Sequence, residues 1–243
     1  MGATGKSTSS YYDFKDNPIL SGNSAYMDGT AEQATEWWKE HDDISNFGSW
    51  VDGLSKEENS ALKSWADIGY SLLSNLYGTE WDKLDPYTKS LATRVYDALN
   101  KFELKKGITV DRATNFRIFG NTGMMTEDQV RDFIANKTDG GLIQSDGFMS
   151  FSTVTNGYQV AGKGLVIHLN VPPSKGAGAY IGNVNPYEKE YLLNNNSILK
   201  FDKNSVRTVA GPNGAKRIHV NATVVGRADM QTIDKKNNSQ FKK

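Results

Sequence analysis

Residues 187–193 read Tyr187-Glu188-Lys189-Glu190-Tyr191-Leu192-Leu193. Two acidic side chains thus lie within a short run of β-forming residues. Successive side chains of a strand point to opposite faces, so this pattern places Glu188 and Glu190 on one face. Two carboxylates at that spacing can raise one another's pKa and divide the roles of base and electrostatic stabiliser. Taken alone the signal is weak, because Glu-X-Glu on an exposed strand is more often a solvated face.

The periodicity of the sequence changes near residue 107. Before it, helical patterning runs from about residue 31 to 105, with a capping box at Ser55 to Glu58 and a helix opened by Asp85-Pro86. One further helix is expected at 127–135. After residue 107 the pattern predicts strands at 108–110, 148–154, 165–171, 187–193, 198–201, 206–210 and 217–225. A chain that begins with helices and continues with many short strands is typical of an α+β fold, so the sequence predicts that class.

Length and composition predict one globular domain. The chain has 243 residues, of which 37% are hydrophobic, which is enough apolar material for a sizeable core. Residues 1–30 are rich in Gly, Ser, Asn and Asp, and we expect a flexible or loosely docked arm there. The expected domain is 31–230, with a helical part at 31–105 and a β-rich part at 106–230. Residues 231–243 are expected to form a polar tail.

The net charge is zero, which argues against a nucleic-acid-binding surface over the whole protein. The charge is nevertheless uneven, since residues 1–100 carry 8 Lys and Arg against 16 Asp and Glu, and residues 101–243 carry 20 against 12. A basic second half suits the binding of a small anion. Attraction between the two halves explains the asymmetry equally well.

Several kinds of site are excluded or unsupported. The chain has no cysteine, which excludes disulfides and thiolate chemistry. The three histidines, His41, His168 and His219, are scattered, and we expect no metal site. No apolar run is long enough to span a membrane. Residues 1–7 lack the apolar region of an intact signal peptide.

Two further stretches carry candidate functional residues. Val110-Asp111-Arg112 places an arginine just past a short strand, and Gly147 to Thr153 reads Gly-Phe-Met-Ser-Phe-Ser-Thr. In the second stretch Ser150 and Ser152 share one face, whereas Met149 and Phe151 point the other way. Neither stretch is specific on its own.

In combination the three stretches are far more specific. Arg112, then the Ser-X-Ser strand, then Glu-X-Glu resembles the Arg, Ser-Thr-Ser, Glu signature of bacterial mono-ADP-ribosyltransferase toxins. Arg112 precedes Ser150 by 38 residues and Ser150 precedes Glu190 by 40, and both intervals fit the family. The resemblance covers roughly residues 50 to 226. It implies a helical segment followed by two packed, mainly antiparallel β-sheets, with NAD as substrate.

The resemblance also implies a role for each matching residue. Arg112 would bind the NAD phosphates, for which a guanidinium fork is suited. Ser150 would orient the catalytic carboxylate. Glu190 would be that carboxylate, would grip the nicotinamide ribose and would stabilise an oxocarbenium-like transition state. Glu188 would act on the acceptor, and in this family a Glu at that place implies arginine as acceptor.

Four other positions belong to the expected site. Ser152 and Phe151 lie in the strand expected to contact NAD, although Phe151 stands where the family often has Thr. Lys163 could replace a second phosphate-binding residue, or it could be an ordinary solvated lysine. Tyr187 could touch the acceptor, or it could pack beneath the loop. Ser145-Asp146-Gly147 lacks the Asn that the family often uses to hold nicotinamide.

The expected protein is an arginine-specific mono-ADP-ribosyltransferase. We expect it to be a monomeric bacterial or phage-borne effector, secreted or delivered into a target cell, where it modifies a host protein. Two alternatives remain open. Water could be the usual acceptor, which would make the protein mainly an NAD glycohydrolase. The chain could also be a catalytically idle binding or phage-particle module with the same fold.

Overall fold

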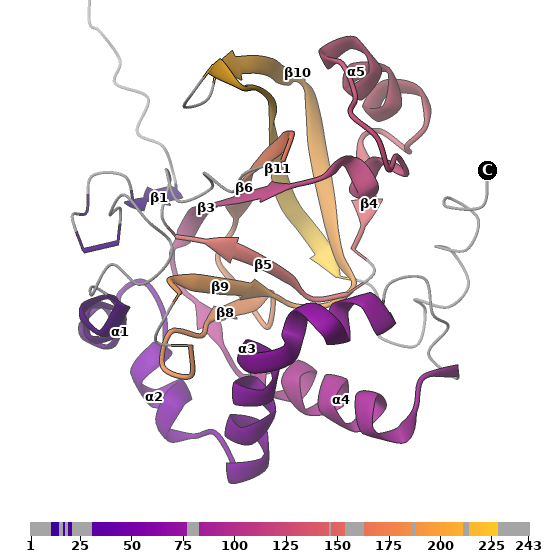
Figure 1. Cartoon of the computed structure of the whole chain (residues 1–243). Helices are drawn as coiled ribbons and strands as arrows, with labels where there is room; N and C mark the ends of the chain where they lie inside the picture. Colours follow the sequence, from indigo (N-terminus) through magenta and orange to yellow (C-terminus); the bar gives the residue numbers. More distant parts are fainter. Residues whose placement is uncertain are drawn as a thin grey trace, which may run out of the picture.

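The structure is a computed structural model that describes residues 11–14, 17, 19–20, 31–76, 83–145, 147–153, 163–185, 188–210 and 214–227, with the backbone alone for Ala31 and 69–76. The first helices are α1 (Ala31–Glu40), α2 (Phe47–Asp52), α3 (Lys56–Leu76) and α4 (Pro86–Asn100). A 3-10 helix, η3 (Phe116–Phe119), and α5 (Glu127–Asn136) follow. In Figure 1, α1 to α4 lie on the side of β8 and β9, and α5 lies on the opposite side beside β10.

Two helix starts follow from local side-chain chemistry. At α3 the Ser55 hydroxyl accepts from the Glu58 backbone N–H at 3.1 Å, and the Glu58 carboxylate accepts from the Ser55 N–H at 2.9 Å. At α4 the Asp85 carboxylate accepts from the Thr88 N–H at 3.0 Å, and Pro86 occupies the first turn. These caps satisfy backbone donors that a helix leaves free at its start. Both predicted starts are confirmed.

The strands form a nine-stranded sheet and a two-stranded sheet. The larger sheet has the order β4-β10-β11-β6-β3-β5-β9-β8, with β1 also paired to β3, and the smaller one joins β2 to β7. Their bounds are β1 (Tyr11–Asp13), β2 (Glu103–Leu104), β3 (Gly107–Thr114), β4 (Leu142–Gln144), β5 (Met149–Ser152), β6 (Leu165–Val171), β7 (Ser174–Lys175), β8 (Gly178–Tyr180), β9 (Glu190–Leu193), β10 (Ser197–Ala210) and β11 (Lys216–Arg227). Most neighbours are antiparallel, although β6 with β11 and β1 with β3 are parallel. The predicted α+β fold is confirmed.

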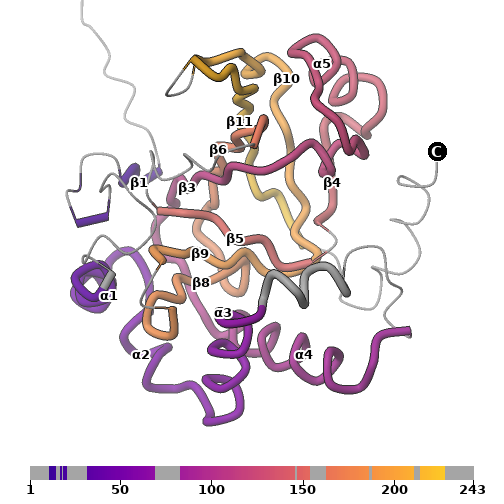
Figure 2. Tube along the Cα trace, viewed as in Figure 1, coloured from indigo at the N-terminus to yellow at the C-terminus, as the bar shows by residue number. Residues whose placement is uncertain are grey.

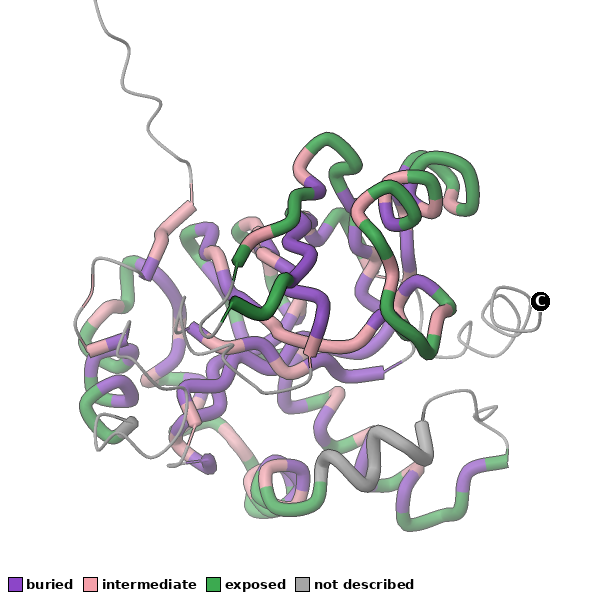
Figure 3. Tube along the Cα trace, turned by 45° about the horizontal axis from the view of Figure 1, so that its top comes forward, coloured by how far each residue is buried: buried purple, intermediate pink, exposed green. Residues whose placement is uncertain are grey.

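The core lies where the helices meet the strands. Trp38 of α1 is fully buried and stacks on Tyr180 of β8 with ring centroids 5.1 Å apart. Trp65 of α3 packs edge-on against Phe148, just before β5, at 5.0 Å. Helices α3 and α4 lie side by side (Figure 2). Figure 3 shows buried residues concentrated in the strands and exposed residues along α5. The tryptophans of α1, α2 and α3 are therefore core residues.

Several boundaries differ from the sequence-based expectation. Strand β3 continues to Thr114, so Arg112 lies within it and not just past a strand at 108–110. Residues 11–13 form strand β1 within the expected flexible arm, because aromatic burial fixes this segment: Phe14 is fully buried 5.7 Å from the Trp38 ring. The expected strands 198–201 and 206–210 belong to one strand, β10, with a register shift between Asp202 and Arg207. The strand expected at 187–193 begins instead at Glu190.

A row of polar side chains crosses three neighbouring strands of the sheet. The Asp111 carboxylate lies 2.7 Å from Nδ1 of His168, and Nε2 of His168 lies 2.9 Å from Nδ1 of His219. These residues come from β3, β6 and β11. Burial raises the pKa of Asp111 despite its bond to His168. Burial, followed by the charges of His168, Arg207 and Arg217, lowers the pKa of His219 to about 4.

Candidate active site

Glu190 is the first residue of β9 and is only 5% exposed. Three elements supply hydrogen bonds to its carboxylate. The Asn185 amide, in the segment between β8 and β9, donates to Oε2 at 3.1 Å. The Ser150 hydroxyl of β5 and the Trp65 indole of α3 also hydrogen bond the carboxylate. A buried carboxylate is therefore held in one position from three sides.

Strand pairing explains how Ser150 reaches Glu190. In the antiparallel pair of β5 and β9, Ser152 lies opposite Glu190 and Ser150 lies opposite Leu192. Ser150 is therefore the diagonal neighbour of Glu190, within reach of a side-chain contact. The alternating burial of β5 leaves both serines half-buried and buries Met149 and Phe151. The prediction that the two serines share a face away from Met149 and Phe151 agrees with this pattern.

Arg112 of β3 lies beside this carboxylate. Its Nη1 donates to the backbone carbonyl of Ser150 at 2.6 Å, which attaches the guanidinium to the strand that carries both serines. Its charge lowers the pKa of Glu190, but burial is the largest influence and the net direction is upward. The Nε of Arg112 is buried and has no hydrogen-bond partner among the described residues. A buried donor of this kind fits an anionic group that accepts from it.

Glu188 lies two residues before β9, at the end of the turn that leads into it. Its backbone N–H donates to the carbonyl of Asn185 at 3.3 Å. Burial, and then the charge of Glu190, raise the pKa of Glu188 to about 7, while a side-chain bond from Asn185 opposes the shift. The expectation that both glutamates lie within one strand is therefore wrong, but their carboxylates do interact. A carboxyl with a pKa near 7 can exchange a proton at neutral pH.

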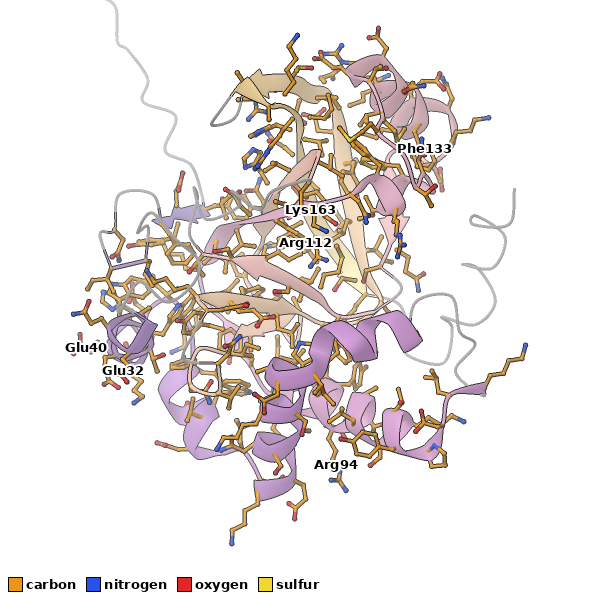
Figure 4. The ribbon with its side chains drawn as sticks, viewed as in Figure 1. Glu32, Glu40, Arg94, Arg112, Phe133 and Lys163 are labelled. Atoms are coloured by element: carbon orange, nitrogen blue, oxygen red, sulfur yellow. The ribbon has the colours of Figure 1, made fainter. Side chains whose placement is uncertain are left out.

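The remaining expected residues are placed differently. Phe151 is 2% exposed and packs in the core, on the face of β5 opposite Ser150 and Ser152. Lys163 is half-buried two residues before β6. Figure 4 labels Lys163, before β6, and Arg112 of β3. Tyr187 lies outside the described residues, as does Asp146.

Sequence reasoning misses two residues of the site. Trp65 is a buried residue of α3, and helical spacing does not reveal that its indole N–H reaches Glu190. Asn185 stands out only as part of a loop. Asn and Pro at 185–186 indicate a turn, yet nothing in a single sequence shows that the amide is directed at carboxylates three and five residues further on.

Metal and membrane features are lacking in the described part of the chain. No group of three or more His, Asp or Glu residues there could hold a metal ion. None of the helices that the structure describes combines the length and the apolar character needed to cross a membrane.

The comparisons with known proteins agree with one another. A model of the ADP-ribosyltransferase exoenzyme family matches residues 36–227. The fold is similar to Plx2a, an ADP-ribosyltransferase toxin from Paenibacillus larvae, at 25% identity and a TM-score of 0.66, over 81% of this chain and 96% of that one. No match to a curated protein sequence was found.

Two other solved structures share the fold. An ADP-ribosyltransferase from Clostridium botulinum is 20% identical with a TM-score of 0.60, over 79% of this chain and 94% of that one. The ADP-ribosylating toxin BECa of C. perfringens, solved with NADH, is 19% identical with a TM-score of 0.64, over 83% of this chain and 50% of that one. Because the family model spans most of the chain, this protein belongs to the ADP-ribosyltransferase exoenzymes, whose substrate is NAD.

Proposed function

We propose that this protein transfers ADP-ribose from NAD to an arginine side chain of a host protein and releases nicotinamide. The observation that carries the proposal is the pair of unlike carboxylates. Glu190 is buried and held by hydrogen bonds, whereas Glu188 is half-buried with a pKa of about 7. Environments that separate two carboxylates in this way suit them to different roles.

The described residues fit NAD as a ligand. Arg112 offers a buried, unpartnered Nε–H for the phosphates, and Lys163 adds a second positive charge on the side of β6. Ser150 and Ser152 present polar groups on the strand to which Arg112 is bonded. We assign these four residues to NAD binding and leave Phe151 out, because its side chain is buried in the core.

Glu190 would act on the bond that breaks. The bond between nicotinamide and the ribose carbon is cleaved with its electron pair leaving on nicotinamide, and positive charge develops on the ribose. A carboxylate fixed in a water-poor site stabilises such a charge strongly, because it needs no reorientation during the reaction. Ser150, Asn185 and Trp65 supply that fixation.

Glu188 would serve the incoming acceptor. An arginine guanidinium has a pKa above about 12 and is a poor nucleophile while protonated. A nearby carboxylate can orient it and accept the proton that leaves as the new carbon–nitrogen bond forms. Tyr187 directly precedes Glu188 in the sequence. Because Glu188 is proposed to act on the acceptor, we propose Tyr187 as an acceptor contact.

We further propose that residues 31–230 act as one catalytic unit and that the protein works as a monomeric, exported bacterial or phage-borne effector. Membership of an exoenzyme family supports export. An idle binding module is disfavoured, because Ser150 hydrogen bonds Glu190, Arg112 hydrogen bonds the Ser150 carbonyl, and the charge of Arg112 acts on Glu190. NAD hydrolysis remains the rival reaction, since it needs the same residues apart from Glu188.

Replacing Glu188 by Gln separates these two reactions. We expect Glu188→Gln to abolish labelling of a simple arginine analogue by labelled NAD while much of the nicotinamide release persists. Water attacks a cationic sugar with less help than a guanidinium requires. Wild-type labelling of the analogue would refute the acceptor role, and parallel loss of both activities would assign Glu188 to NAD cleavage. Labelling of a host-cell lysate then tests for a protein target.

A further inference from the structure

Asn185 stands between the two carboxylates of the site. It is 7% exposed, and its Nδ2 donates to Oε2 of Glu190 at 3.1 Å. The same side chain also hydrogen bonds Glu188. An amide nitrogen carries two hydrogens, so it can serve two carboxylates at once.

The backbone fixes Asn185 in this position. Its N–H donates to the carbonyl of Ile181 at 3.0 Å, and its own carbonyl accepts from the N–H of Glu188 at 3.3 Å. These two bonds hold the backbones of Asn185 and Glu188 close to each other. The N–H of Ile181 donates in turn to the carbonyl of Glu190 at 3.0 Å, which links the turn to the start of β9.

We infer that Asn185 is the positioning residue that lets Glu188 and Glu190 be ionised together and so sets the pH range of transfer to the acceptor. The inference rests on the proposed acceptor role of Glu188. Two carboxylates at close range repel each other when both are charged, and the cost is high in a buried site. A shared donor offsets the repulsion because it stabilises the charged form of both groups.

The neighbouring charged groups do not stabilise the ionised form of Glu188, whereas Asn185 does. Arg112 of β3 lowers the pKa of Glu190, whereas the pKa of Glu188 is set by burial, Glu190 and Asn185. Among the described residues that influence Glu188, Glu190 raises its pKa and Asn185 alone lowers it. Glu188 therefore depends on the amide of Asn185 more than Glu190 does, since Glu190 also has Ser150 and Trp65.

Two substitutions distinguish this role from simple packing. Asn185→Ala removes both donor hydrogens, and Asn185→Asp keeps the shape but adds a third negative charge. If Asn185 only filled space, Asp would be tolerated better than Ala. The positioning role predicts the reverse order, because a carboxylate at 185 disfavours ionisation of both glutamates. Asn183→Ala, a change in the same turn, is the matched control.

The experiment measures nicotinamide release and labelling of an arginine analogue by each folded variant from pH 5 to 9. In Asn185→Ala we expect the acid limb of the transfer rate to move up by about one pH unit, as loss of a hydrogen bond to a charged group implies. We expect a larger shift in Asn185→Asp and none in Asn183→Ala. An unchanged limb in both Asn185 variants would overturn the inference, whereas retention of transfer by Glu188→Gln would overturn the proposed function instead.

Discussion

The Nη1 of Arg112 and the backbone carbonyl of Ser150 are 2.6 Å apart, so β3 and β5 are joined by a side chain at the point where Glu190 approaches both. The Nη1 of the guanidinium thus holds the Ser150 carbonyl, while its Nε has no hydrogen-bond partner among the described residues. This division of donors makes the effect of a lysine at 112 predictable.

Arg112→Lys should weaken NAD binding more than it harms folding. Lysine keeps the charge but lacks the planar fork, so it cannot hold the Ser150 carbonyl and an anion together. We expect the Kd for NAD to rise roughly 10- to 100-fold, as loss of a charge-assisted hydrogen bond implies. Calorimetry measures the affinity, and thermal unfolding measures the stability. An unchanged Kd would remove Arg112 from the phosphate site.

Glu190→Gln should abolish nicotinamide release and arginine labelling together. The substitution keeps the shape and removes the negative charge, and loss of such a fixed charge costs on the order of 100- to 1,000-fold in kcat. We expect folding to change little, or to improve, because a buried carboxylate is replaced by a neutral amide. Turnover at the wild-type rate would show that Glu190 is not the catalytic carboxylate.

Transfer to arginine should rise with pH through about pH 7, because Glu188 must lose its proton to accept another and its pKa is about 7. The rate of nicotinamide release in the absence of an acceptor should not show this rise near pH 7. The ratio of the two rates, measured from pH 5 to 9, isolates the titration of Glu188 from that of Glu190. A ratio independent of pH would mean that Glu188 does not act as a base.

Stability should fall between about pH 6.5 and pH 4 because of His219. Its pKa is lowered to about 4 in the folded protein, so the unfolded chain, with a pKa near 6.5, takes up the proton first as the pH falls. The contribution of neutral His219 to the free energy of unfolding is complete above the pKa of the unfolded state. With allowance for solvent screening it amounts to about 2 kcal/mol, and it is lost as the pH falls through the pKa of the folded state. Denaturant unfolding of His219→Gln should show a shallower decline over this range. His41→Gln is the control, and an equal slope in wild type and His219→Gln would contradict the assignment.

Sequence patterns predict the fold where local chemistry decides it. The caps at Ser55 and Asp85 and strand β6 depend on neighbouring residues, and the structure has them at their predicted places. The family resemblance, drawn from three short stretches, is confirmed. The individual roles of Arg112, Ser150, Ser152, Glu188 and Glu190 remain predictions that the experiments above test.

What could not be predicted depends on contacts between distant segments. Strand β1 forms because Phe14 packs against Trp38, and no local pattern in a polar arm shows this. Strand β9 starts only at Glu190, and the backbone N–H of Glu188 donates instead to the carbonyl of Asn185. The contact of Trp65 with Glu190 joins a helix to a strand that is distant in the sequence.

That contact has a practical consequence. The indole of Trp65 touches the carboxylate on which the reaction is proposed to depend, so a natural fluorophore reports on the charge beside it. The difference between the emission of the wild type and of Trp65→Phe should follow ionisation of Glu190, and it should change when NAD covers the site. The protein thus carries its own optical probe, and ligand binding can be observed in real time without a label.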